Sequence, residues 1–121
     1  MDDVTILQAE ILKVLASPRR LDLLHALAEG PCEVGRLALL VGATQPNVSQ
    51  HLAVMRAAGV VESERDGREV RYRLADPEVL VACETMRRVL ERRLTRLAAT
   101  ATIAALRPDG SLPPRRLGVR P

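Results

Sequence analysis

The sequence predicts a single, mainly α-helical domain with one small β-hairpin. Three observations support this: apolar residues recur at helical spacing, a tight-turn signal separates two strand-like runs, and aromatic residues are almost absent. Tyr72 is the only aromatic residue among 121, so Leu, Val, Ile, Met and Ala must form the core. A core of such residues favours helices, and a chain of this length buries one ordinary core.

Composition also limits the function. The net charge is +3, and every cationic side chain except Lys13 is an arginine, whose planar fork of donors suits phosphates and guanine edges. The lack of aromatic rings argues against modules that stack single-stranded bases. No apolar run is long enough to cross a membrane, and the acidic N-terminus does not resemble a secretion signal, so we expect a cytoplasmic protein.

Three helices are expected before residue 42. Apolar residues at helical spacing predict the first helix over residues 5–15. The second begins after the capping residue Ser17 and stops at Gly30-Pro31. A short extended segment at residues 32–34 then leads to a brief third helix over residues 36–41.

The fourth helix has an unusual outward face. Thr44 is its predicted cap, and the helix ends before Gly59. Val48, Leu52 and Met55 form one apolar stripe. The residues that point the other way are Pro46, Asn47, Gln50, Ala53 and Ala57. The Gln, Asn and Ser side chains of this helix can hydrogen-bond to bases and phosphates, although a solvated face on a helical bundle would also explain the small and polar residues.

A β-hairpin follows the fourth helix. Strand-like runs at residues 60–65 and 68–74 flank Asp66-Gly67, a strong turn signal. In the second run, apolar side chains alternate with Arg71 and Arg73, which predicts one buried face and one basic face. Short helices, a polar-faced helix and a basic two-stranded hairpin, in this order, predict a winged helix-turn-helix with about five helices.

The last helix is predicted to run from the cap Asp76 to about Ala104. It is too long to bury its apolar stripe on so small a domain, so we expect a homodimer that also uses the first helix. The expected interface residues are Leu7, Ile11, Val79, Cys83, Met86, Leu90 and Leu94. Residues 1–106 would form the domain, and residues 107–121, rich in Pro, Gly and Arg, a disordered basic tail.

From about Ile11 to Leu97 the sequence resembles the ArsR-type (ArsR/SmtB) family of bacterial winged-helix regulators. The matching segments are LASPRRL at 15–21, QPNVSQHL at 45–52, residues 52–56 with 59–61, and DGREVRYRL at 66–74. The resemblance implies a repressor that binds a near-palindromic operator on double-stranded DNA as a homodimer. It also implies release of the DNA when an inducer binds.

The inducer is not identified, because the family's familiar metal ligands are replaced. Glu33 and Gly35 stand where one site has two cysteines. Asp76, Glu78, Val89 and Arg92 match the four positions of a second site, where Val and Arg cannot bind zinc. Cys83 and Cys32 remain the candidates for a transition metal or a thiol-reactive signal, and packing is the simpler role for Cys83. A regulator without a small-molecule sensor is the alternative.

The sequence favours DNA binding over two rival functions. No nucleophile set, metal-binding His pair or phosphate loop can be assembled, so an enzyme is not expected. A winged-helix module that binds another protein should carry apolar residues where this chain has polar and basic ones. The candidate DNA contacts are Gln45, Pro46, Asn47, Ser49, Gln50, His51, Arg68, Arg71 and Arg73.

Overall fold

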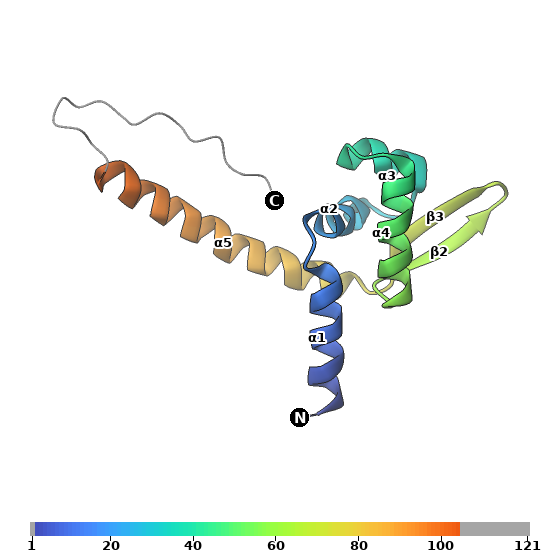
Figure 1. Ribbon diagram of the computed structural model, residues 1–121, viewed down its shortest axis with the longest axis horizontal. Coiled ribbons are helices and arrows are strands. Elements are labelled where there is room, and N and C mark those ends of the chain that lie inside the picture. The colour runs from blue at the N-terminus through green and yellow to red at the C-terminus, as the bar shows by residue number, and fades with distance from the viewer. Residues whose placement is uncertain (1, 105–121) are drawn as a thin grey trace. The chain divides into compact units, whose positions relative to one another are not determined.

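The computed structural model describes residues 2–104 (Figure 1), and the side chains of residues 2–101. The chain divides into two units, Met1–Leu80 and Val81–Pro121. The first holds all the short helices and the sheet, and the second holds most of the last helix. The predicted tail at residues 107–121, and its boundary after residue 106, lie outside the described residues.

Side-chain caps set the starts of the helices in the first unit. The helices are α1 (Asp3–Leu15), α2 (Pro18–Ala26), the 3₁₀ turn η1 (Leu27–Glu29), α3 (Val34–Val41) and α4 (Gln45–Ala57). Ser17 and Thr44 cap α2 and α4 as predicted. Helix α3 begins two residues earlier than predicted, because the Glu33 carboxylate accepts the Arg36 backbone N–H at 3.1 Å and caps it there.

The sheet has three antiparallel strands where the sequence predicted two. The strands are β1 (Cys32–Glu33), β2 (Val61–Asp66) and β3 (Glu69–Leu74), in the order β1-β3-β2. Cys32 pairs with Tyr72 and Glu33 with Arg71, which joins the segment before α3 to the hairpin. A two-residue strand is too short to show an alternating pattern, so only its extended conformation could be predicted.

The hairpin turn lies one residue further along than predicted. Asp66 pairs with Glu69, so the two central residues of the turn are Gly67 and Arg68, not Asp66 and Gly67. Gly67 has φ +64° and Arg68 does not have a positive φ. This combination matches a type II′ turn, in which glycine occupies the first central position, whereas Asp66-Gly67 would have required a type I′ turn.

The core of the first unit lies between α2, α3, α4 and the start of β2. Its fully buried side chains are Leu23, Leu24, Leu27, Leu37, Val48, Leu52, Met55 and Val61. The predicted stripe of α4 is confirmed, since Val48, Leu52 and Met55 are each 0% exposed. Each such side chain contributes roughly 1.5–3 kcal/mol of burial free energy, so the stripe fixes which face of α4 points outward.

The last helix, α5 (Pro77–Ala104), is as long as predicted. The Asp76 carboxylate caps it by accepting the Glu78 backbone N–H at 3.0 Å. Most of its large apolar side chains beyond Leu80 are exposed in the single chain. None of the helices in the described part of the chain is long and apolar enough to cross a membrane.

Candidate nucleic-acid interface

The outward face of α4 is polar, exposed and uncharged over its first two turns. Gln45, Asn47, Ser49 and Gln50 are all exposed, and Pro46 lies in the first turn. Within residues 2–101 their side chains form no hydrogen bond or ion pair, so their donors and acceptors are available to a ligand. The Thr44 hydroxyl accepts the Asn47 backbone N–H at 3.3 Å and begins the helix there.

His51 lies at the edge of this face and contacts α2. The Arg20 Nε donates to His51 Nδ1 at 3.1 Å, and another guanidinium nitrogen of Arg20 donates to the Val14 carbonyl at 3.0 Å. Burial, followed by the charges of Arg20 and Arg19, lowers the pKa of His51 below its ordinary value. His51 is therefore held as a neutral imidazole beside the polar face of α4.

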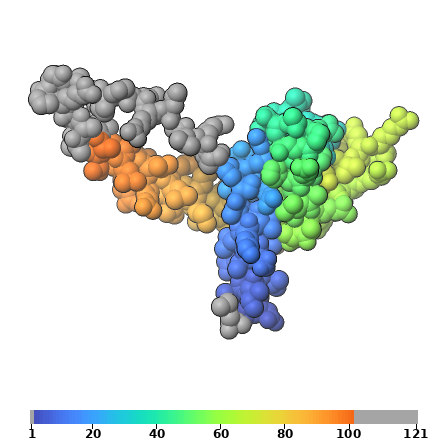
Figure 2. All heavy atoms as spheres, in the orientation of Figure 1, coloured from blue at the N-terminus to red at the C-terminus, as the bar shows by residue number. Residues whose placement is uncertain are grey.

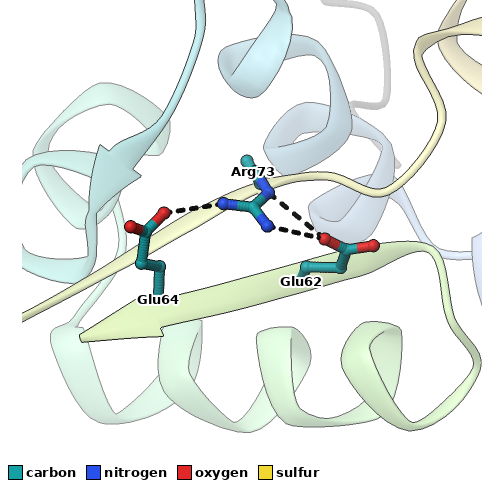
Figure 3. A network of polar contacts seen from close by, with 3 residues as sticks. All are labelled: Glu62, Glu64 and Arg73. Carbon is teal, nitrogen blue, oxygen red and sulfur yellow. Dashed lines mark hydrogen bonds and ion pairs between the residues drawn. The ribbon is translucent and has the colours of Figure 1, made fainter.

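The wing face that the sequence predicted to be basic carries more carboxylates than guanidinium groups. Figure 3 shows Arg73 between two carboxylates of β2: its nitrogens lie 2.9 and 3.2 Å from Glu62 and 2.6 Å from Glu64. The hydrogen bond to Glu62 and the charges of both carboxylates raise the pKa of Arg73 above its ordinary value. This guanidinium is already paired within the wing.

Arg71 is on the same face and is also near carboxylates. It lies 3.7 Å from Glu69 and 3.9 Å from Asp66, distances that permit attraction without good hydrogen bonds. The prediction of a basic face was wrong because it read β3 alone. Residues of β2 that share this face contribute Glu62 and Glu64.

Two arginines near the hairpin turn are exposed and unpaired. Arg68 occupies the second central position of the turn, and Arg65 pairs in register with Val70 on the opposite face of the sheet from Arg71 and Arg73. Neither guanidinium has a hydrogen bond or an ion pair within the described residues. Arg65 was absent from the sequence-based candidates, although its place one residue before the turn could have indicated it. The hairpin extends from the helical body of this unit (Figure 2).

A cavity of about 450 Å³ lies where η1, β1, α3 and β3 meet. Cys32, Arg36, Leu40 and Arg71 are among the residues that line it. Burial raises the pKa of the Cys32 thiol, and the thiol lies 3.6 Å from the Glu33 carbonyl. A raised pKa disfavours the thiolate, which is the form that reacts and binds metals.

Burial also disfavours the thiolate of the second cysteine. Cys83 is half-buried on α5, and burial raises the pKa of its thiol. No three His, Cys, Asp or Glu side chains in the described part of the chain are grouped to hold a metal ion. The two cysteines stay candidates from the sequence, and the described residues do not assemble a ligand set around either of them.

The expected dimer residues lie on apolar surfaces that the single chain leaves open. On α1, Leu7 is 64% exposed, and Ile11 is half-buried. On α5, Met86, Leu90 and Leu94 are 55%, 47% and 65% exposed. Val79 and Cys83 are half-buried. Exposed apolar rows of this kind are typical of helices that pack on a partner.

Comparison with known proteins identifies related regulators. The family model described as "Bacterial regulatory protein, arsR family" matches residues 17–63. A helix-turn-helix (HTH)-type transcriptional regulator of Mycobacterium tuberculosis is 40% identical over 106 residues, which cover 87% of this chain and 91% of the relative. The crystal structure of that regulator matches with a TM-score of 0.70 at 37% identity, covering 81% of this chain and 99% of the other.

Two further relatives extend the match. The solution structure of a homodimeric winged helix-turn-helix DNA-binding domain from Mycobacterium bovis has a TM-score of 0.70 at 28% identity, covering 79% of this chain and 93% of that domain. The transcriptional regulator CmtR of M. tuberculosis is 46% identical over 68 residues, 56% of this chain and 58% of the relative. The structural likeness confirms the predicted winged helix-turn-helix fold.

Proposed function

The chain belongs to the ArsR family of bacterial transcriptional regulators, and we propose that it is a repressor that binds a near-palindromic operator on double-stranded DNA as a homodimer. The observation that carries the proposal is the exposed, uncharged polar face of α4 above a fully buried stripe. An enzyme is excluded by the family, whose members are regulators.

In this proposal α4 enters the major groove. Gln45, Asn47, Ser49 and Gln50 supply the side chains that hydrogen-bond to base edges and nearby phosphates, with Pro46 in contact at the helix start. Amide side chains form paired hydrogen bonds with adenine, which gives Asn47 and Gln50 the chemistry for sequence recognition. The Val48–Leu52–Met55 stripe keeps this face turned away from the core.

The wing contributes sequence-independent contacts. We assign the main phosphate contact to Arg68 at the turn, assisted by Arg65, because both guanidinium groups are exposed and have no partner among the described residues. Arg71 is a weaker candidate, since Asp66 and Glu69 lie near it. Arg73 contacts phosphate only if it exchanges its carboxylate partners for DNA, so its contribution is the smallest.

A second copy of the chain would cover the apolar rows of α1 and α5. The M. bovis relative is a homodimer, and the exposed apolar side chains of both helices in this chain fit the same use. A two-fold dimer presents two α4 helices and two wings, which matches a near-palindromic site. Such a repressor would act in the cytoplasm, where bacterial DNA lies.

The proposed repressor releases its operator when an inducer binds. Cys83 and Cys32 are the residues that we propose for a metal ion or a thiol-reactive species. A solved structure of the relative CmtR names it a cadmium metal-sensor, which makes a soft metal the first candidate. Operator release should be measured with metals, arsenite and persulfide for the parent, Cys83→Ser and Cys32→Ser. Release that persists in both variants would remove cysteine sensing.

The DNA-binding proposal is tested by selection from a randomised pool of duplexes. We expect the parent to enrich a near-palindromic sequence and to bind it as two chains per duplex in analytical ultracentrifugation. Failure to enrich any sequence, with the protein folded, would refute operator binding and favour a winged-helix module that binds protein instead. Enrichment with one chain per duplex would refute the homodimer.

A further inference from the structure

We propose that Arg20 is a positioning residue that holds His51 as an uncharged Nε2–H donor to a backbone phosphate of DNA. The proposal rests on the proposed function, because it assigns a role within the same DNA-binding surface. It is carried by the hydrogen bonds that join α1, α2 and α4 at this point: Arg20 Nε to His51 Nδ1 at 3.1 Å, and Arg20 to the Val14 carbonyl at 3.0 Å.

The proton of His51 lies on the ring nitrogen that Arg20 does not contact. A guanidinium group has only donors, so the Nδ1 atom that it contacts must accept with its lone pair. A neutral imidazole with an unprotonated Nδ1 carries its proton on Nε2. The contact with Arg20 therefore selects one tautomer of His51 and makes Nε2 a hydrogen-bond donor.

The Nε2 atom of His51 is accessible to a ligand. No described residue other than Arg20 forms a hydrogen bond with the His51 side chain. Every buried side-chain nitrogen or oxygen of the described residues has a hydrogen-bond partner. Nε2 of His51 has no such partner among them, so it must be exposed to solvent. His51 follows Gln50 at the edge of the polar face, and about half to two-thirds of the hydrogen bonds between proteins and DNA go to the sugar-phosphate backbone.

Arg20 is itself anchored by a second hydrogen bond. Its second hydrogen bond satisfies a carbonyl in the last turn of α1, one of the acceptors that a helix end leaves without a partner. With both ends of the guanidinium engaged, the Arg20 side chain is held in one orientation. The charged guanidinium group of Arg20 is thereby held against a carbonyl and an imidazole, so His51 and not Arg20 contacts the DNA.

A neutral donor has a measurable signature. A phosphate contact by a cation releases condensed counterions, and losing one changes the slope of log affinity against log salt by about 0.9. An uncharged donor adds affinity without releasing a counterion. His51→Ala should therefore weaken binding by roughly tenfold with the salt slope unchanged, and equally for a selected duplex and one of random sequence.

A double-mutant cycle isolates the role of Arg20. His51→Gln places an amide N–H near the Nε2 position and removes the acceptor at Nδ1, so it should bind nearly as well as the parent. Arg20→Met should weaken binding by roughly threefold or more with His51 present, and have little effect in the His51→Gln background. Any general effect of the lost charge is common to both backgrounds and cancels in the cycle.

Nitrogen NMR of the free protein gives a readout that needs no DNA. We expect an unprotonated Nδ1 and a protonated Nε2 for His51 in the parent at neutral pH, and a His51 titration midpoint that rises in Arg20→Met. A protonated Nδ1 while the parent still binds DNA would overturn this inference alone. Thermal unfolding of each variant checks that the fold is retained.

The binding arm has three further outcomes that would overturn the inference. They are an unchanged affinity for His51→Ala, a lowered salt slope for that variant, and an equal loss from Arg20→Met in both backgrounds. The last would mean that Arg20 acts by itself. If the parent bound neither duplex, the proposed function would fail and the inference would fail with it.

Discussion

Replacement of Arg68 by alanine should reduce the salt dependence of DNA binding. Arg68 is exposed at the hairpin turn and has no partner among the described residues, so its whole charge is available to a phosphate. One lost contact lowers the salt slope by about 0.9, and the two copies in a homodimer lower it by about 1.8. When the salt concentration rises about fourfold, the ratio of the parent's DNA affinity to the variant's should fall roughly tenfold.

The matched control removes one negative and one positive charge elsewhere on the wing. Glu62→Gln combined with Arg73→Gln leaves the net charge unchanged and deletes a guanidinium that is already bound to carboxylates. We expect its salt slope to equal that of the parent. Arg92→Ala, on the exposed surface of α5, removes the same charge as Arg68→Ala and should also leave the slope unchanged.

Fluorescence anisotropy with one duplex over a series of salt concentrations provides the slopes. A salt slope lowered as much in the Glu62/Arg73 double variant as in Arg68→Ala would contradict the assignment of the phosphate contact to Arg68. That result would mean that Arg73 leaves its carboxylates to meet DNA. An unchanged slope for Arg68→Ala would remove the turn from the DNA contact altogether.

Three further predictions concern stability and pH. Leu52→Ala should lower the free energy of unfolding by roughly 3 kcal/mol, because Leu52 is 0% exposed beneath the recognition face; a urea-unfolding loss under 1 kcal/mol would contradict the packing. Gly67→Ala should cost about 1 kcal/mol from its φ of +64° alone, since nothing lies within 4 Å of the added methyl, and no loss in urea unfolding would argue against the turn. Burial, followed by the charges of Arg20 and Arg19, lowers the pKa of His51, so the folded protein binds this proton less readily than the unfolded chain. The contribution of His51 to the free energy of unfolding should be complete above pH 6.5 and lost as the pH falls through the folded pKa of His51. His51→Gln should therefore make the urea midpoint less dependent on pH in this window. An equal pH dependence of the urea midpoint in both proteins would contradict this expectation.

Features fixed by local chemistry could be predicted from the sequence. The helix caps Ser17, Thr44 and Asp76 and the buried stripe of α4 follow from residue types and helical spacing, and the structure confirms them. The length of α5 follows in the same way. The family was identified from short segments, and the comparisons confirm it.

Features that depend on pairing between distant residues were missed or misjudged. The charge of the wing face depends on which β2 residues oppose Arg71 and Arg73, and this register shifts with the position of the turn. The third strand arises because Cys32 and Glu33 meet β3 some forty residues later in the chain. The contact between Arg20 and His51 joins residues 31 positions apart and leaves no periodic signal in the sequence.

The most direct test of DNA reading by α4 is the ratio of affinities for the selected duplex and a random duplex, measured for the parent and for Gln50→Ala. Gln50 is exposed and its side chain makes no hydrogen bond or ion pair within the described residues, so its replacement should leave the unfolding temperature unchanged. The ratio should fall by a factor equivalent to about 1–3 kcal/mol, because the loss affects base recognition and spares the phosphate contacts. An unchanged ratio, with the protein folded and bound to DNA, would contradict the assignment of this face as the one that reads the sequence.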